Sequence, residues 1–135
     1  MKDSLRPGVT RTETHIVDRP RTIDFMGEEL RIYATPELLR DIEVTSRNLL
    51  LEHCSPGEDS VGVRVEFDHS AATPLGMEVR ITATVASIEG RRVVLDVVAN
   101  DAVEEIARGR HTRFIVDVAK ARQRLAAKAK AGGTG

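Results

Sequence analysis

The sequence predicts an α+β domain in which an antiparallel β-sheet wraps around one long helix. Three observations lead to this prediction. One stretch has apolar residues at helical spacing over a wide arc, several later stretches have them at every second position, and this order of elements rules out a parallel βαβ sheet. The chain has 135 residues, the size of one domain, and 41% of them are hydrophobic, which suffices for a core. Aromatic residues make up only 3%, so we expect an aliphatic core.

The elements that precede the main sheet are predicted from β-branched residues and helix-start residues. Residues 9–18 are rich in β-branched side chains and stop before Pro20, which predicts a strand, and residues 30–34 predict a short second one. A helix signal follows, with Thr35 as N-cap and Pro36 at the first helical position. The helix should end before a Ser-Pro-Gly breaker, and its apolar residues are Leu38, Leu39, Ile42, Leu49 and Leu50.

After the breaker, the apolar period changes from 3.6 residues to 2, which predicts strands. A single alternating phase runs through Val61, Val63, Val65 and Phe67, and it predicts one apolar face on a half-buried strand. Further strands are predicted over residues 77–85, 92–99 and 104–118, the last with Thr112, Phe114, Val116 and Val118 on one side.

The end of the chain differs in composition from the rest. From Ala119 it consists mainly of Ala, Lys and Arg, which favours a surface helix. We therefore predict a domain over residues 1–118, followed by a basic C-terminal helix and flexible tail over residues 119–135. An antiparallel sheet around one buried helix is the hot-dog architecture, and this is the predicted fold.

The charge distribution argues against a nucleic-acid partner. The formal net charge is −1, and residues 120–135 hold five basic side chains and no acid, so removing these five charges leaves −6 on residues 1–119. An acidic body is untypical of duplex-DNA binding, and three Phe and one Tyr are too few for stacking single-stranded bases.

Cysteine and histidine usage indicates the compartment and argues against a metal. A single cysteine, Cys54, cannot form an intramolecular disulfide, and no stretch approaches the roughly 20 apolar residues of a membrane span. We expect a cytoplasmic protein with no membrane association. The spacing of His15, His53 and His111 matches no metal motif, so no metal site is predicted.

Three polar residues interrupt the apolar pattern and are candidates for chemistry. Glu43 lies on a leucine-lined flank of the helix, where half-burial would raise its pKa; alternatively, it pairs with Arg47 one turn on. His69 continues the odd-numbered phase of its strand, which points its imidazole at the helix, although a satisfied core histidine fits the same pattern. Thr35 needs no role beyond that of an N-cap.

The surroundings of these residues resemble a known family. The segments are A-T-P-E-L-L-R-D-I-E (34–43), V-G-V-R-V-E-F-D-H (61–69), S-I-E-G-R-R (87–92) and E-I-A-R-G-R-H-T-R-F-I-V-D (105–117). Their order and spacing resemble the fluoroacetyl-CoA thioesterase-like family of hot-dog acyl-CoA thioesterases. The resemblance implies hydrolysis of acyl-CoA without a metal or redox cofactor, in a homodimer with sites at the interface. It also implies catalytic roles for Thr35, Glu43 and His69, and a place for Gly62 in the wall of the acyl pocket.

Physical chemistry limits the roles of these residues. An enzyme that hydrolyses a thioester needs a nucleophile or oriented water, a base, and hydrogen-bond donors for the developing oxyanion. We assign Glu43 as general base or nucleophile, His69 as proton carrier, and Thr35 as nucleophile or water-positioning hydroxyl. Eight residues separate Thr35 from Glu43, roughly 12 Å along a helix. Either the helix begins after Thr35 and the loop folds back, or a second subunit completes the site.

The substrate is less well defined than the reaction. An apolar lid upstream of Thr35 is expected to select fluoroacetyl groups, and here that segment, residues 24–29, carries three acids. We therefore expect another small or medium acyl-CoA, with its phosphates held by some of the arginines Arg91, Arg92, Arg110 and Arg113. Two alternatives stay open: a non-catalytic hot-dog module that binds acyl-CoA or an acyl carrier, and hydration of an enoyl thioester. An ion-paired Glu43 with no cavity beside His69 would favour the non-catalytic module.

Overall fold

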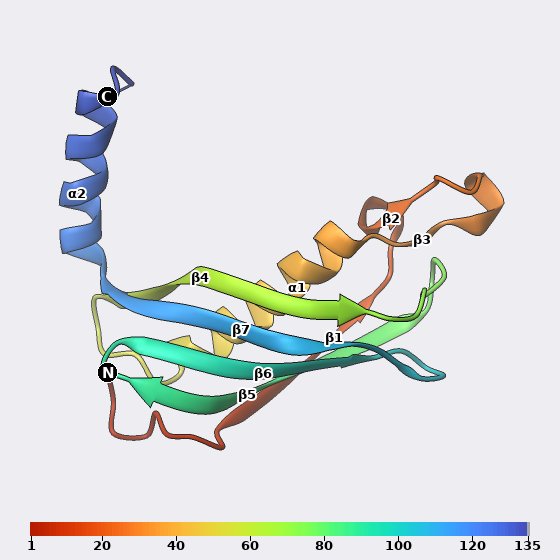
Figure 1. Ribbon diagram of the computed structural model, residues 1–135, viewed down its shortest axis with the longest axis horizontal. Coiled ribbons are helices and arrows are strands. Elements are labelled where there is room, and N and C mark those ends of the chain that lie inside the picture. Colours follow the sequence, from red (N-terminus) through yellow and green to blue (C-terminus); the bar gives the residue numbers. More distant parts are fainter. Residues whose placement is uncertain (135) are drawn as a thin grey trace.

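The computed structural model describes residues 1–134, and it contains one large sheet and two helices. Five antiparallel strands form the large sheet in the order β1-β5-β6-β7-β4. Their bounds are Thr10–Ile16 (β1), Glu58–His69 (β4), Glu78–Glu89 (β5), Arg92–Asn100 (β6) and Glu105–Asp117 (β7). Two short strands, Thr22–Ile23 (β2) and Ile32–Tyr33 (β3), form a second sheet, and the helices are Thr35–Leu51 (α1) and Val118–Ala131 (α2) (Figure 1).

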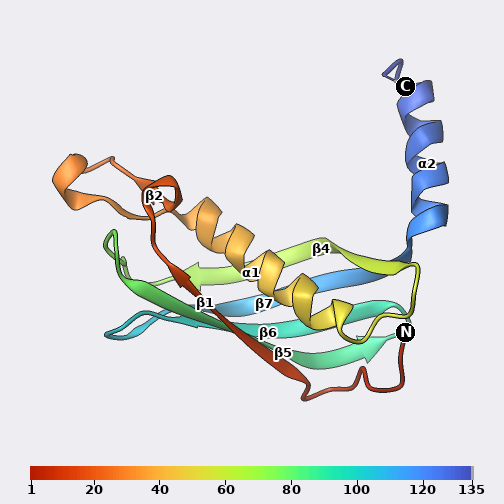
Figure 2. The same ribbon diagram turned by 180° about the vertical axis from the view of Figure 1, so that it is seen from behind.

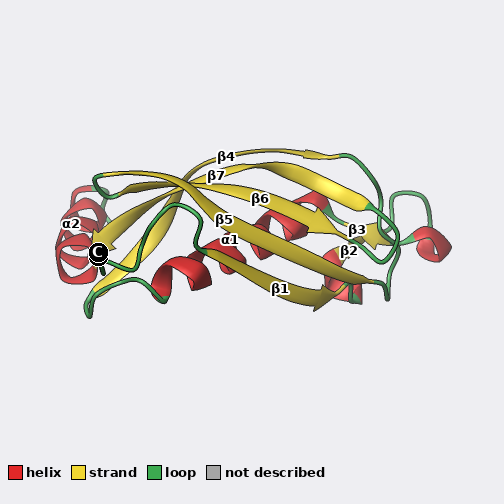
Figure 3. Cartoon of the chain, turned by 90° about the horizontal axis from the view of Figure 1, so that it is seen from below, coloured by secondary structure: helices red, strands yellow, loops and turns green. Residues whose placement is uncertain are grey.

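Helix α1 lies against one face of the large sheet, and the aliphatic core fills the space between them (Figure 2). The predicted apolar arc of α1 is buried at Leu38, Ile42, Leu49 and Leu50. The same core includes alternating buried residues of β5 and β6, which lie on the predicted face: Val79, Ile81, Ala83 and Val85 of β5, and Val93, Leu95 and Val97 of β6. Complete burial of one such aliphatic side chain contributes about 1.5–3 kcal/mol. The view along the sheet shows the strands curving over α1, as the hot-dog architecture predicts (Figure 3).

Strand β4 corrects the prediction of one alternating phase from Val61 to His69. Opposed residues of paired strands share a face, and Gly62 pairs with Arg113 whereas Arg64 pairs with Thr112. Val63 is thus the extra residue of a β-bulge, which shifts the phase by one residue. Before the bulge, Gly62 faces α1 and Val61 faces outward, 48% exposed. After the bulge, the predicted phase through Val65, Phe67 and His69 faces α1.

Strand β7 turns His111 and Arg113 towards α1, rather than the side that carries Phe114 and Val116. His111, Arg113 and Ile115 are buried towards α1, whereas Phe114 on the other side is 39% exposed. The predicted side with Thr112, Phe114 and Val116 is therefore the outer one. A buried arginine and histidine are tolerated because each finds hydrogen-bond partners beneath β4.

The start of α1 also differs from the prediction. Ala34 occupies the N-cap position, with extended backbone and no capping side chain, and Thr35 is the first helical residue. Pro36 is accordingly the second helical residue, where its missing N–H is still without cost. The Thr35 hydroxyl is therefore available for another partner.

Helix α2 begins at Val118, one residue before the predicted boundary. The Asp117 carboxylate caps it by accepting a hydrogen bond from the backbone N–H of Lys120 at 3.0 Å. None of the α2 residues is buried, and the helix projects away from the sheet (Figures 1 and 2). The predicted flexible tail falls partly on residue 135, outside the described residues. Neither helix within residues 1–134 is long and apolar enough to span a membrane.

Candidate active site

Thr35 and His69 meet at the end of the molecule where α1 begins and β4 ends. The Thr35 Oγ1 atom lies 2.8 Å from His69 Nδ1, which is a hydrogen bond between residues 34 positions apart. His69 reaches Thr35 because the phase after the bulge points its side chain towards α1. The hydroxyl expected to cap the helix therefore contacts the candidate proton carrier instead.

The surroundings of His69 favour a neutral imidazole. Burial lowers the pKa of His69 below its usual value, because a charged ring loses hydration there. Its second nitrogen, Nε2, is buried and has no hydrogen-bond partner within residues 1–134. The rings of Tyr33 and His69 lie nearly perpendicular to each other, with their centroids 6.4 Å apart. A neutral imidazole bonded to a hydroxyl can accept its proton as a general base.

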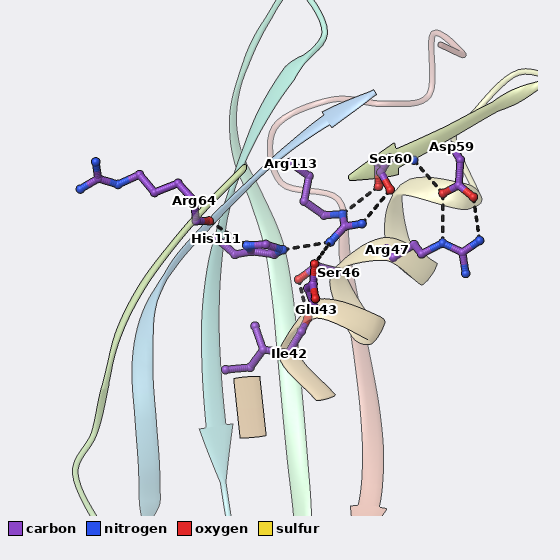
Figure 4. Close-up of polar contacts among 9 residues, drawn as sticks. All are labelled: Ile42, Glu43, Ser46, Arg47, Asp59, Ser60, Arg64, His111 and Arg113. Atoms are coloured by element: carbon purple, nitrogen blue, oxygen red, sulfur yellow. Dashed lines mark hydrogen bonds and ion pairs between the residues drawn. The ribbon is translucent and has the colours of Figure 1, made fainter. Parts of the chain in front are cut away.

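A second cluster surrounds Glu43 near the middle of α1, and we call Glu43, Gly62, His111 and Arg113 the Glu43 cluster. Figure 4 shows its side chains, Glu43, His111 and Arg113. Arg113 Nη1 donates to Glu43 Oε2 at 3.2 Å. Two further nitrogens of Arg113 donate to the hydroxyl and carbonyl of Ser60, both at 2.8 Å. The Arg113 side chain is 4% exposed and that of Glu43 47%. The guanidinium is thus held in place, and the carboxylate reaches it from a half-exposed position.

His111 connects this cluster to the backbone of β4, and its contacts define its tautomer. His111 Nδ1 lies 2.9 Å from the carbonyl oxygen of Arg64, which can only accept, so Nδ1 carries the proton. Nε2 lies 3.1 Å from Arg113 Nη1 and accepts from it. Burial, with a contribution from the Arg113 charge, lowers the pKa of His111. Burial likewise lowers the pKa of Arg113.

Gly62 leaves room for the Glu43 carboxylate. A Cβ atom on Gly62 would lie 2.6 Å from Glu43 Oε2 and 3.0 Å from His111 Cε1. The carboxylate also borders a cavity of about 290 Å³, lined by Leu39, Glu43, Gly62, Val63, Arg64, Val65 and His111. This cavity has apolar walls and a few polar groups, as small-molecule sites commonly do. It opens along β4, the edge strand of the sheet.

The structure therefore joins the four candidate residues in two pairs, Thr35 with His69 and Glu43 with Gly62. Because α1 begins at Thr35, the alternative of a loop that folds back towards Glu43 is wrong. The seven intervening residues are all helical, and a separation of eight positions corresponds to about 12 Å along the axis. The other alternative for Glu43, an ion pair with Arg47, is also wrong, since Arg47 binds Asp59 at 2.7 Å.

The sequence did not single out all the residues around these pairs. The sequence predicts no metal role for His111 and only a phosphate contact for Arg113, yet both residues lie beside Glu43. Their position two residues apart on one strand was the available signal, because such residues share a face. Asp41, only 4% exposed, is a further polar residue in the buried arc of α1, next to Ile42, and this position was the available signal for it. It accepts hydrogen bonds from Tyr33 and Arg21.

The segment expected to act as a lid, residues 24–29, lies beyond the start of α1. Its two large apolar side chains, Phe25 and Met26, are 85% and 58% exposed. Arg31 pairs with Asp24 at 3.7 Å and with Glu28 at 2.9 Å, so two of the three acids hold the segment together.

Comparisons with known proteins agree with this fold and sequence pattern. Residues 17–119 match the family described as fluoroacetyl-CoA-specific thioesterase. The fluoroacetyl-CoA thioesterase of Streptantibioticus cattleyicolor is 32% identical over 139 residues, which cover 98% of this chain and 100% of the relative.

Solved structures give the same result. A crystal structure of a variant of the fluoroacetyl-CoA-specific thioesterase is 30% identical, with a TM-score of 0.85 over 94% of this chain and 99% of that one. A hot-dog-like protein from Thermanaerovibrio acidaminovorans is 28% identical, with a TM-score of 0.82 over 90% of this chain and 91% of that one. The predicted hot-dog fold is confirmed.

Proposed function

The chain belongs to the fluoroacetyl-CoA-specific thioesterase family of thioester hydrolases, and we propose that it hydrolyses a small or medium acyl-CoA through Thr35, Glu43 and His69. The observation that carries the assignment of residues is the 2.8 Å hydrogen bond between the Thr35 hydroxyl and the His69 imidazole. A neutral histidine beside a hydroxyl is a common arrangement for activating an oxygen nucleophile.

The proposed reaction adds water across the thioester. Where water attacks the carbonyl carbon, the carbon–sulfur bond breaks and the products are a carboxylic acid and the free thiol of CoA. Where an oxygen of Thr35 or Glu43 attacks instead, the same bond breaks to give the free thiol and an acyl-enzyme, which water hydrolyses to the carboxylic acid in a second step. His69 receives the proton of the attacking hydroxyl or water and returns it to the departing sulfur. Glu43 acts as general base or nucleophile in the cavity bordered by Gly62. Arg113 and the backbone N–H groups around Gly62 are candidate donors for the oxyanion.

We propose that the working enzyme is a homodimer in which a second copy completes the site. Two features support this proposal. The Thr35–His69 pair and the Glu43–Gly62 pair lie apart in one chain, and β4 is an edge strand with the exposed apolar residues Val61, Val63 and Val65. Unpaired backbone groups and exposed valines on an edge favour association with another strand.

The proposed substrate differs from fluoroacetyl-CoA because the segment of residues 24–29 carries Asp24, Glu28 and Glu29. Acids near a lid disfavour a dry, tightly closed acyl site, so we propose another small or medium acyl group. We place the protein in the cytoplasm, because its single cysteine, Cys54, is free and buried.

The deciding experiment is free-thiol release from a panel of acyl-CoAs, from fluoroacetyl to medium-chain, by wild type and by Thr35→Ala, Glu43→Ala and His69→Ala. We expect Glu43→Ala and His69→Ala to lower kcat/KM by at least about 10²-fold, as loss of a general acid or base does. Arg47→Ala is the matched control on α1, because Arg47 binds Asp59 outside the cavity. Unchanged turnover in both the Glu43 and the His69 variants would refute the residue assignment.

One observation favours the alternative of a non-catalytic module that binds acyl-CoA or an acyl carrier. Glu43 is ion-paired with Arg113, and such a pair occupies the carboxylate. A carboxylate that is 47% exposed beside a cavity remains accessible to a ligand, which is why we prefer the enzyme. Binding of acyl-CoA without thiol release from any member of the panel would establish the alternative.

A further inference from the structure

Helix α2 lacks the contacts that a helix of its length needs. It spans 14 residues, and none of them is buried. Isolated helices of about 12–15 residues are marginal in water, so most helical stability comes from tertiary contacts. Within residues 1–134, α2 has no ion pair, and Leu125 in its middle is 66% exposed. The helix therefore presents an unpartnered surface.

Helix α2 lies next to β4, which is an exposed edge of the sheet. The backbone N–H of Val118 donates to the carbonyl of Gly57 at 2.9 Å, so α2 starts next to the beginning of β4. From there it extends past β4, on the side where a further strand would lie (Figures 1 and 2). Any chain that pairs with β4 consequently comes close to α2.

When a second copy pairs through β4, the end of the partner's β4 comes to lie close to α2. Two copies of one strand that continue a sheet about a two-fold axis run antiparallel, so the beginning of each β4 lies beside the end of the other. Around the end of β4 lie His69, the β4–β5 loop and the β6–β7 turn, since His69 pairs with Ala107. Tyr33 N–H donates to the carbonyl of Thr73 in that loop, which adds the segment of residues 24–29 to the same end.

Helix α2 and the end of the molecule around His69 are complementary in charge and in apolar character. Residues 118–131 contain five basic side chains and no acid. The end of the molecule around His69 presents three exposed carboxylates that have no ion pair within residues 1–134: Glu29, Asp68 and Glu104. Leu75 and Val103, 43% and 75% exposed, lie at the same end and match Leu125. We call this region the acidic end.

We propose that, in the β4-paired dimer, α2 of each protomer docks on the acidic end of the other. The occupant of this surface is a second copy of the chain, and the inference rests on the homodimer in the proposed function. Each α2 thereby contacts the other protomer close to that protomer's Thr35–His69 pair. Opposite charges on the two surfaces also favour the antiparallel arrangement over other pairings, because like charges would otherwise be juxtaposed.

The first test compares dimer dissociation by sedimentation equilibrium. Arg124→Glu combined with Lys128→Glu reverses two charges on α2, and Arg6→Glu combined with Arg92→Glu is the matched control, with the same charge change on exposed arginines outside α2. We expect the α2 double variant to raise the dissociation constant at least about tenfold and the control to leave it within about twofold. Adding Asp68→Lys and Glu104→Lys to the α2 variant should restore dimerisation.

The second test locates the contact directly. Wild-type protein mixed from unlabelled and ¹⁵N-labelled chains is cross-linked with a zero-length carboxyl–amine reagent. We expect links from Lys120, Lys128 or Lys130 to Glu29, Asp68 or Glu104 that join one labelled and one unlabelled peptide.

The outcomes separate the two proposals. A dimeric wild type whose dissociation is unaffected by the α2 reversal, and which yields no such links, overturns the docking of α2 and leaves the homodimer intact. A monomeric wild type overturns the homodimer and the docking together, while thiol release tests the chemistry independently. Loss of binding to anionic phospholipid vesicles in the α2 variant, with an unchanged dimer, would also overturn the docking and assign α2 to a lipid surface.

Discussion

Gly62 is the residue at which the candidate site tolerates no side chain. A methyl group there would collide with the end of the flexible Glu43 side chain, at 2.6 Å from Oε2. Because Glu43 is half-exposed, it can move away towards solvent, and the fold can absorb the substitution. The carboxylate would then leave its place beside Arg113 and the cavity.

We expect Gly62→Ala to lower kcat/KM at least about tenfold while changing the free energy of unfolding by less than about 1 kcal/mol. Gly109→Ala is the contrasting control, because its Cβ would lie 2.1 Å from the backbone oxygen of Glu66 and 2.4 Å from Phe67 Cα. Backbone atoms cannot yield so easily, so this variant should lose about 2 kcal/mol or more of stability. Steady-state thiol release and urea denaturation measure both effects, and full activity in Gly62→Ala would contradict the site.

Protonation of the buried histidines makes stability depend on pH. Burial lowers the pKa of both His69 and His111 in the folded protein, so the unfolded chain binds protons more readily. Their contribution to stability is complete above the unfolded pKa of about 6.5 and is lost as the pH falls from there through the folded pKa values. Arg113 and Glu43 are the charged groups that face His111.

We therefore predict that the urea midpoint falls between pH 7.5 and pH 5, and that His111→Gln reduces this fall. Glutamine keeps a donor and an acceptor but does not titrate. His53→Gln, which removes a histidine bonded to Ser4 near the surface, should keep the wild-type fall. A pH dependence identical in all three proteins would show that His111 is not responsible.

Among the structural elements, the segment that precedes α1 is anchored by one buried polar cluster. Asp41 accepts hydrogen bonds from Arg21 at 2.9 and 3.2 Å and from the buried hydroxyl of Tyr33. Burial, together with the Asp41 carboxylate, raises the pKa of Tyr33, so its hydroxyl remains a donor. The cluster joins residues 21–33 to α1 and sets Tyr33 against His69.

We expect Tyr33→Phe to destabilise the protein by about 1–3 kcal/mol, because a buried carboxylate loses one donor. Amide hydrogen exchange should increase in residues 21–34 and remain unchanged in β5 and β6, since the phenyl ring still fills its place in the core. Thr12→Val, which removes an exposed threonine pair with Thr82, is the control and should leave residues 21–34 unchanged. Uniform protection in Tyr33→Phe would show that this cluster does not hold the segment.

For the molecule as a whole, the two edges of the sheet are not equivalent. Both edge strands expose an aliphatic side chain, Val61 on β4 at 48% and Ile16 on β1 at 54%. Only β4 lies beside the cavity and beside α2, so only this edge is expected to pair with a second copy.

We predict that Val61→Glu raises the dimer dissociation constant by at least about tenfold, because it buries uncompensated charge near the two-fold axis. Ile16→Glu is the matched control on the other edge and should leave the dimer unchanged. Sedimentation equilibrium at several protein concentrations measures both. Equal effects of the two variants would remove β4 as the pairing edge.

Local patterns were sufficient to predict most elements of this protein. The alternating residues of β5 and β6 and the leucines of α1 are periodic over long enough stretches to identify both the element and its buried face. The identities of Thr35, Glu43, His69 and Gly62 as candidates also came from sequence, through the resemblance to a family. Each of these inferences depends on residues close together in the chain.

Only the tertiary structure decided how these residues meet. The bulge at Val63 turns Gly62 and His69 to the same face although their positions differ by an odd number, and no periodicity reveals such an extra residue. Likewise, the sequence pattern favours a surface position for His111 and Arg113, whereas in the structure β4 supplies a partner for each, the Arg64 carbonyl for His111 and Ser60 for Arg113. The sequence by itself determined the helices and strands, because the spacing of apolar residues is a local property of the chain. The strand register and the packing of β4 against α1 determined the site, because those contacts join residues far apart in the chain.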